Sequence, residues 1–420
     1  MSAIGWVDFS AEHRERVNSV IDLLSTPGVI DELGVGVIRD VFSDLLFPGI
    51  STIQTRAKYF LAVPRIFKDY EKLPANQRRR RKLADYLNDH ENLCMEVMVA
   101  NHKDDPQNGI IGESFANGQG EVQRKPSSVY WTGIRQFGLI QTKLSLQAFC
   151  RKFANPDQHL QDLVHGSDKT TGDDPDAAEQ ANETINGPTY EDNWIETLVV
   201  HLSKNEASFL SRQIEARVPL SLLGQILLDA EVRTKFVALP KDWNFTRLAD
   251  EAPFLGQLPD RLQRVIAAAR DFWQLMHGAH IRYNCLLQDR HGSSELRAAF
   301  ELMWTGWLTS LQSFNWERWD TCFLWELTKR HHTNVRNYTI HFVESWIDGC
   351  RDAVDTNFLD ELVGRQERFS KKSRARLHPS AEESIGKWIG IEDLNYRLNV
   401  VRTIVNDIHV GLTSSEAGDA

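Results

Sequence analysis

The chain has 420 residues, of which 41% are hydrophobic and 25% are charged, and its formal net charge is −10 at pH 7. This length accommodates two to three domains, and the composition is that of an ordinary globular protein. The net charge excludes a protein whose whole surface binds phosphate, but it leaves room for local basic patches because the charge is unevenly distributed.

Neither the N-terminus nor the cysteines indicate export. The first residues lack a basic segment followed by an apolar one, so we expect no signal peptide, and the apolar runs are too short to span a bilayer. An odd number of widely spaced cysteines without a CxxC pair suits a reducing compartment. They are Cys94, Cys150, Cys285, Cys322 and Cys350. We therefore predict a cytoplasmic protein that makes no contact with a membrane.

The first 155 residues show the apolar spacing of successive helices. These helices are expected after Ser10, within 31–47, from Ser51 or Thr52, and from near Asn76. Pro64 falls inside the third and should kink or split it. The fourth would begin with a run of positive charges at 78–82, where the helix dipole disfavours them.

A Pro-led, Ser-capped amphipathic segment follows at 124–140, RKPSSVYWTGIRQFGLI, and its helical pattern stops at Gly138. In a winged-helix interpretation this helix enters the major groove, with a wing formed by residues 139–140 or by the Gly-rich turn before Val122. The candidate contact residues are Lys125, Ser127, Tyr130, Trp131, Arg135 and Gln136. The alternative is a buried helix whose apolar residues Val129, Trp131, Ile134 and Phe137 face a core, and the sequence leaves both open.

Residues 156–190 form the clearest linker. Between residues 168 and 192 there are eight acidic side chains and one basic one, Lys169. Such a tract lacks the apolar surface that would order it. We therefore predict an N-terminal helical domain at 1–155 with a winged-helix-like element, an acidic flexible linker at 156–190, and a C-terminal helical domain at 191–420. The predicted fold class is mainly α.

The C-terminal part is nearly all helical in pattern. Helices are expected after Asp192, after Ser203 or Asn205, from Pro219, and over 260–290, 294–314, 316–330, 336–355 and 393–410. Twelve tryptophans, concentrated in this half, favour a large helical core over a cofactor site. We expect no cofactor.

Two basic clusters stand out in an otherwise acidic chain. The first is Arg78, Arg79, Arg80, Arg81 and Lys82; the second is Arg365, Arg368, Lys371, Lys372, Arg374 and Arg376, which we interpret as a flexible basic loop. Either cluster could bind phosphates, and its affinity would then fall steeply with salt. A solvated surface is the alternative for both.

Motifs for catalysis are lacking. His277 and His280 share a helix face and have a spacing that could bind a metal, with residues 331, 332 and 341 as further histidines. The sequence has no HExxH, no phosphate-binding glycine loop and no nucleophile elbow, and the segment 121–125 lacks the strand-borne aspartate of a PD-(D/E)xK nuclease. We expect no metal site, and a non-enzyme is favoured.

Four stretches carry a resemblance. They are GWVDF at 5–9, FPGIST at 47–52 with RAKYF at 56–60, PSSVYW at 126–131, and RYN at 282–284. Together they resemble a family of bacterial proteins of similar length that has only an unknown-function designation. Proteins similar to this one tend to be encoded on mobile or defence-associated islands, so the resemblance implies a part in such a system. It supplies no catalytic residues.

The leading hypothesis is a nucleic-acid-associated, non-catalytic component of a bacterial system for defence or of a mobile element, with DNA or RNA and further proteins as partners. One alternative is a scaffold that docks a partner through its aromatic-rich helices. That scaffold would need an exposed patch formed by Trp304, Trp307, Trp316, Trp319 and Trp325. The second alternative is an unrecognised hydrolase or nuclease, which would need a pocket of histidines and carboxylates.

Overall fold

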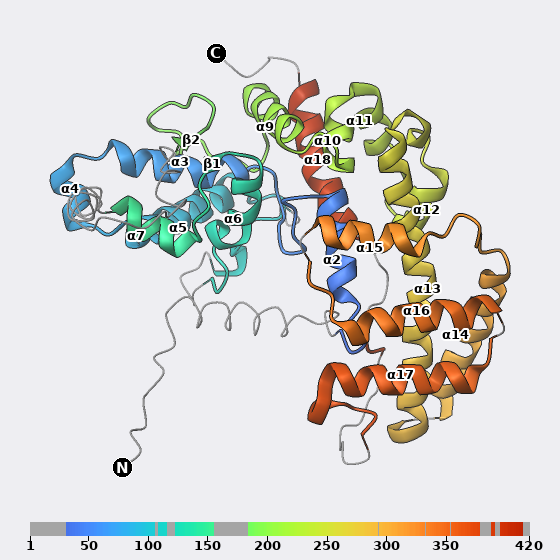
Figure 1. The fold of residues 1–420 in the computed structure, drawn as a ribbon. Helices are drawn as coiled ribbons and strands as arrows, with labels where there is room; N and C mark the ends of the chain where they lie inside the picture. The colour runs from blue at the N-terminus through green and yellow to red at the C-terminus, as the bar shows by residue number, and fades with distance from the viewer. Residues whose placement is uncertain are drawn as a thin grey trace, which may run out of the picture. The chain divides into compact units, whose positions relative to one another are not determined.

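A computed structural model describes residues 31–105, 108–115, 122–154, 184–292, 294–331, 333–352, 354–378, 388–390 and 395–414. The described chain is built almost entirely from helices (Figure 1), so the mainly α fold class is confirmed. In the same residues, strands β1 (Ile140–Gln141) and β2 (Thr184–Ile185) form a two-stranded antiparallel sheet. Every helix in this part of the chain is too short or too polar to cross a bilayer.

The chain divides into two compact units, each assembled from separate segments. Unit 1 contains the described residues of Met1–Phe42, Asn244–Ala249 and Arg264–Tyr396, and unit 2 those of Ser43–Trp243, Asp250–Gln263 and Arg397–Ala420. This division differs from the predicted one, because residues 43–155 and 191–243 belong to the same unit. The predicted linker lies mostly outside the described residues.

Unit 2 includes helix α18, which lies near the C-terminal end of the described chain and packs on α9 and α11. Its elements are α3 (Tyr59–Lys72), α4 (Ala75–Arg80), α5 (Leu83–Asn101), η1 (Glu113–Phe115), α6 (Pro126–Gln136), α7 (Leu146–Ala154), α9 (Lys204–Arg217), α10 (Leu222–Leu228), α11 (Ala230–Val237), η3 (Leu255–Gln257) and α18 (Leu398–Thr413), with β1 and β2. Helix α3 packs on α5 and α6, whereas α18 packs on α9 and α11. Chain ends that are far apart in sequence therefore share one core.

Unit 1 is built around the long helix α13 (Asp260–His291). The other elements of this unit are α14 (Ser294–Gln312), α15 (Thr321–Arg330), α16 (Asn337–Asp352), α17 (Thr356–Lys371) and η4 (Lys372–Arg374). The residues of α2 (Gly36–Leu46) and α12 (Phe245–Glu251) are divided between the two units, as are those of α13, whose residues 260–263 belong to unit 2. Helices α16 and α17 pack against each other. Buried tryptophans hold α13: the indole of Trp346 donates to the carbonyl of Leu275, and that of Trp307 donates to Gln274.

Local signals located several elements correctly. Gly138 has φ +67°, and the amide of Leu139 donates to the carbonyl of Ile134, so α6 ends at the predicted glycine. Ser203 caps α9, and its side chain and that of Glu206 bond each other's backbone amides. The longest predicted helix is α13.

The helix predicted from Ser51 or Thr52 begins only at Tyr59. The reason is that the backbone of 55–57 bonds to distant side chains: the amides of Thr55 and Arg56 donate to the Tyr130 hydroxyl, and that of Ala57 donates to Asp407. These side-chain acceptors take the place of the backbone carbonyls that the same amides would bond to in a helix. Pro64 lies inside α3 without splitting it, although it removes one backbone hydrogen bond of the helix.

Other boundaries also differ from the prediction. Residues 192–197 form turns and 198–202 are irregular, so the helix predicted after Asp192 is absent there. The helix predicted from Pro219 is divided into α10 and α11. The division falls at Asp229, whose carboxylate accepts from the amides of Glu231 and Val232 and so caps a new helix. The helix predicted after Ser10 lies outside the described residues.

Candidate nucleic-acid interface

Helix α6 is a core helix. Tyr130 is fully buried, its hydroxyl donates to the carbonyl of Arg56, and burial raises its pKa to about 12. Ser127 is buried as well, and its amide donates to Glu91. The apolar residues of the alternative interpretation, Val129, Trp131, Ile134 and Phe137, are all buried. Tyr130, Ser127 and Trp131 therefore present no surface with which to contact a nucleic acid.

The remaining candidates on α6 are partly engaged in packing. The guanidinium of Arg135 donates to the carbonyls of Lys143 and Leu144, Lys125 bonds to Asn92, and Gln136 is exposed. Residues 139 and 140 are fully buried and so form no exposed wing. The Gly-rich turn at 116–121 lies outside the described residues.

A buried carboxylate fixes the start of this helix. Glu91 accepts from the Ser127 amide at the N-terminus of α6. Desolvation raises the pKa of Glu91 to about 7, although the bonds from Ser127 and the charge of Lys125 act in the opposite direction. The helix start is thus held by a side chain of α5, as in a packed core.

The first basic cluster spans a break between two helices. Helix α4 ends at Arg80 and α5 begins at Leu83, so arginines 78–80 occupy the last turn of α4, where the dipole favours positive charge. The Tyr70 hydroxyl donates to the carbonyls of Arg78 and Arg81 and holds this break. The predicted conflict with the helix dipole therefore does not arise for arginines 78–80, whereas Arg81 and Lys82 still precede the first turn of α5. Side chains 79–82 are exposed.

The second basic cluster is helical rather than a loop, because α17 extends to Lys371. Asp355 caps the helix, and residues 359, 362, 363 and 366 are buried at helical spacing. The apolar residues Leu359, Leu362 and Val363, with the cap at Asp355, were present in the sequence and could have identified the helix. The high charge of the run obscured it.

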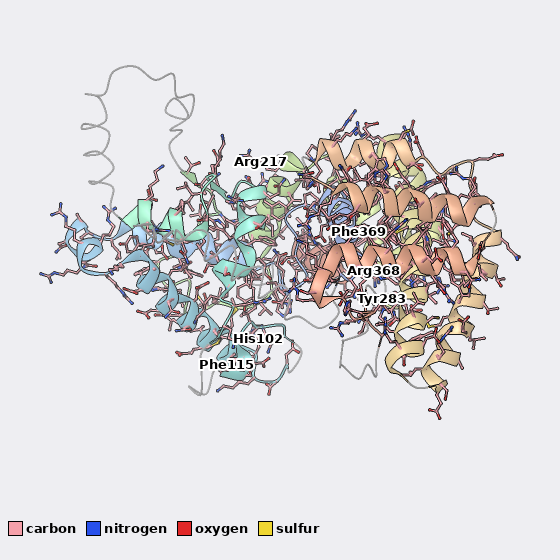
Figure 2. All side chains as sticks on the ribbon, turned by 60° about the horizontal axis from the view of Figure 1, so that its bottom comes forward. His102, Phe115, Arg217, Tyr283, Arg368 and Phe369 are labelled. Atoms are coloured by element: carbon pink, nitrogen blue, oxygen red, sulfur yellow. The ribbon has the colours of Figure 1, made fainter. Side chains whose placement is uncertain are left out.

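Two buried carboxylates hold the turn that follows α17. Glu367 accepts from the Tyr283 hydroxyl at 2.7 Å and from the amides of Arg376 and Leu377. Glu32 pairs with Lys371 and with Arg376, each at 3.1 Å. Lys371 and Arg376 therefore have a carboxylate partner within the fold, and we no longer count them as candidates for binding nucleic acid. Figure 2 shows Tyr283 beside the last turn of α17.

The other four cations of this cluster are exposed: Arg365, Arg368, Lys372 and Arg374. None of the four forms an ion pair with a carboxylate in the described part of the chain. Lys372 adopts φ +55° and ψ −122°, a conformation in which glycine is strongly preferred. A lysine here costs about 1–3 kcal/mol of backbone strain.

An aromatic pair involves the last turn of the same helix. Phe369 lies on the last turn of α17 (Figure 2). It is 52% exposed, and its ring stacks on that of Tyr338 with centroids 5.9 Å apart and planes 22° apart. Tyr338 belongs to the first turn of α16, and the guanidinium of Arg336 lies over its ring. Sequence analysis missed all three residues. We call the four cations together with Arg336, Tyr338 and Phe369 the α17 face.

The histidines do not gather into a site. His280 is fully buried and His277 half-buried on α13, and burial lowers their pKa values to about 3 and about 4. His331 bonds to Thr333, His341 is exposed on α16, and residue 332 lies outside the described chain. Among the described residues, no group of three or more histidine, cysteine or acidic side chains could hold a metal ion.

The tryptophans of the scaffold hypothesis are mostly internal. Trp304, Trp307 and Trp319 are buried, and Trp316 and Trp325 are half-buried. The five residues therefore do not form the exposed patch on which that hypothesis depends.

The fold and this face define a mainly α-helical protein of two units, one of which presents exposed cations beside an aromatic pair. A family model described as a family of unknown function matches residues 1–410, and the chain belongs to that family, DUF6361. The family resemblance inferred from the sequence is thereby confirmed. No curated protein and no solved structure matches the chain.

Proposed function

We propose that the protein binds nucleic acid as a non-catalytic component of a larger bacterial system, and that the α17 face makes the contact. The observation that carries this proposal is the presence of four exposed cations without an acidic ion-pair partner among the described residues, in a chain of net charge −10. Clustered cations of this kind bind phosphates by releasing counterions from the nucleic acid.

Lys372 provides the most specific support. A positive charge near a helix C-terminus is itself favourable, so the position of Arg368 requires no ligand. Lys372 differs, because its φ of +55° would be adopted by glycine at little cost. A strained residue that bears an exposed charge suggests that the charge, rather than the turn, is what the position requires.

The first cluster offers weaker support. Arg81 pairs with Asp89 and lies over the Tyr86 ring at 5.1 Å, and Arg79 also has a partner. Helix-end electrostatics and these contacts account for much of the α4 cluster without a ligand. We therefore place the main contact at α17 and treat α4 as a second, comparison site.

Binding of fluorescent single-stranded DNA or RNA should be measured by anisotropy between about 50 and about 200 mM salt. Replacing Arg365 and Arg368 by alanine should lower the affinity and reduce the slope of log K against log salt by about 1.4, or 0.7 for each lost phosphate contact. Lys372→Gly should weaken binding while relieving backbone strain, so that the loss does not reflect unfolding.

The matched control is Lys329→Ala with Arg330→Ala. These two exposed cations end α15 in the same unit, and their removal changes the net charge by the same amount. Binding that is lost equally in the control would show a general charge effect and contradict the α17 assignment. Loss confined to Arg79→Ala with Arg80→Ala would move the interface to α4.

The place in a bacterial defence or mobile-element system, with partner proteins, is proposed from the sequence resemblance alone. The scaffold alternative lost its exposed tryptophan patch, and the hydrolase alternative has no metal-binding group in the described residues. Neither is favoured by a specific observation.

A further inference from the structure

The α17 face contains more than charge. Single exposed apolar side chains are common on protein surfaces and need no explanation. Phe369 differs because it is 52% exposed while stacked on Tyr338, and because it stands on the same helical face as Arg365. The result is a flat aromatic platform with cations beside it.

We propose that the ligand of the α17 face is a single strand, and that one of its bases stacks on the Phe369–Tyr338 pair. This inference rests on the proposed nucleic-acid function and specifies its ligand. Every base has a π-face, so aromatic stacking contributes to single-strand binding regardless of sequence. The neighbouring cations would follow the phosphates on either side of the stacked base.

Duplex nucleic acid fits this platform poorly. Its bases are already stacked on one another, and an aromatic side chain reaches them only after a step has been unstacked at a cost of about a few kcal/mol. Phe369, the exposed aromatic side chain of the α17 face, is not placed to insert between base pairs, because its ring stacks on that of Tyr338 rather than projecting alone. A strand with free bases avoids this cost.

The α4 cluster lacks a comparable platform. Its nearby aromatic residues, Tyr70 and Tyr86, are both buried, and the Tyr86 ring is stacked on His90 with centroids 3.7 Å apart. We therefore expect contacts at α4 to be insensitive to the number of strands. The single-strand preference belongs to the α17 face.

The test uses the full-length chain with a labelled oligothymidylate of about 16 nucleotides and a duplex of equal length. Phe369→Leu keeps an apolar side chain but removes the π-face, and it should weaken single-strand binding by about tenfold while leaving the salt slope unchanged. Duplex binding should not change. Phe369→Tyr, which keeps an aromatic ring, should bind the single strand about as tightly as the unaltered protein does.

Phe358→Leu is the matched control, since Phe358 is 44% exposed at the opposite end of α17. Equal single-strand binding by Phe369→Leu and the unaltered protein would overturn the inference. So would equal affinity of the unaltered protein for the two strand forms. A changed oligomeric state of Phe369→Leu in size-exclusion chromatography would assign the pair to self-association, which also overturns it.

The two proposals fail in different ways. Absence of binding to either strand form at low salt removes the proposed function together with this inference. Loss of affinity in Arg365→Ala with Arg368→Ala, combined with unchanged binding by Phe369→Leu, removes the stacking inference and leaves the proposed function standing.

Discussion

Three charged residues in the stretches that carry the family resemblance form ion pairs within the fold. In RAKYF, Arg56 forms a two-pronged ion pair with Asp407, and Lys58 lies 2.7 Å from both carboxylate oxygens of Glu206. In RYN, Arg282 pairs in the same way with Asp360 of α17. Each charge is buried or nearly so and has a partner. These ion pairs therefore attach segments that are far apart in sequence to one another.

The Lys58–Glu206 pair yields a prediction. Lys58→Met should lower the free energy of unfolding by about 3–5 kcal/mol, because it leaves the Glu206 carboxylate buried without its counter-charge. Lys58→Met combined with Glu206→Gln should recover much of the loss, since glutamine can still accept from the Ser203 amide. Urea unfolding measures the free energies, and amide hydrogen exchange in α9 localises them.

The control for this prediction is the exposed pair Lys235–Glu231, one helical turn apart on α11. Lys235→Met should change the free energy of unfolding far less than Lys58→Met does, because water screens a surface ion pair. A loss in Lys58→Met no larger than in this control would show that the buried pair contributes nothing special to unit 2.

At the scale of elements, the sequence predicted what neighbouring residues determine. The capping box at Ser203, the end of α6 at Gly138 and the length of α13 all depend on residues within a few positions. The late start of α3 does not, because its cause includes Asp407, 351 residues from Arg56. No local pattern contains that partner.

The candidate interface shows the same limit. The basic residues at 365–376 were identified from composition, but their sorting into free and engaged cations depends on Glu32, which is far away in sequence. The pairing of Phe369 with Tyr338 likewise follows from the packing of α17 on α16. The number of charged residues can be counted from the sequence, but which cations are paired with carboxylates can be known only from the fold.

A glycine in α6 tests the packing of elements. Alanine usually stabilises a helix interior relative to glycine by about 1 kcal/mol. At Gly133 an added Cβ would lie 2.4 Å from the carbonyl oxygen of Gly49 and 2.6 Å from the Phe60 ring. Gly133→Ala should therefore destabilise the protein by about 1–3 kcal/mol, measured as a lower Tm by circular dichroism.

Gly306→Ala on α14 provides the contrast. An added Cβ at Gly306 meets no atom within 4 Å, so this substitution should raise Tm through helix propensity alone. If Gly133→Ala raised Tm as well, the close approach of α6 to the turn at Gly49 would be contradicted.

At the scale of the whole molecule, the order of the chain does not match the order of its units. Unit 2 takes residues from both sides of the predicted linker and also takes α18. Unit 1 likewise depends on residues before α2, since Gln366 donates to the carbonyl of Leu33 and Glu32 pairs with Lys371. A change in composition along the sequence indicated a domain boundary, but compact units are defined by contacts, which here cross that boundary.

This organisation predicts how fragments behave. A fragment of residues 1–155 contains Arg56 and Lys58 but lacks Asp407 and Glu206, so two buried cations lose their counter-charges. We expect this fragment and the complementary fragment 191–420 each to lack a cooperative thermal transition when produced alone. Co-expressed, they should purify together through a tag on one of them and melt cooperatively, because unit 2 needs both.

The control is the same co-expression with Arg56→Ala and Lys58→Met in the shorter fragment, which should reduce the recovered complex because these two ion pairs with the longer fragment are lost. Circular dichroism of the isolated 1–155 fragment decides between the two divisions of the chain. A cooperative transition in that fragment alone would support an independent N-terminal domain and contradict the shared core. Its absence, with recovery on co-expression, would mean that α18 and α9 complete a unit begun at residue 43.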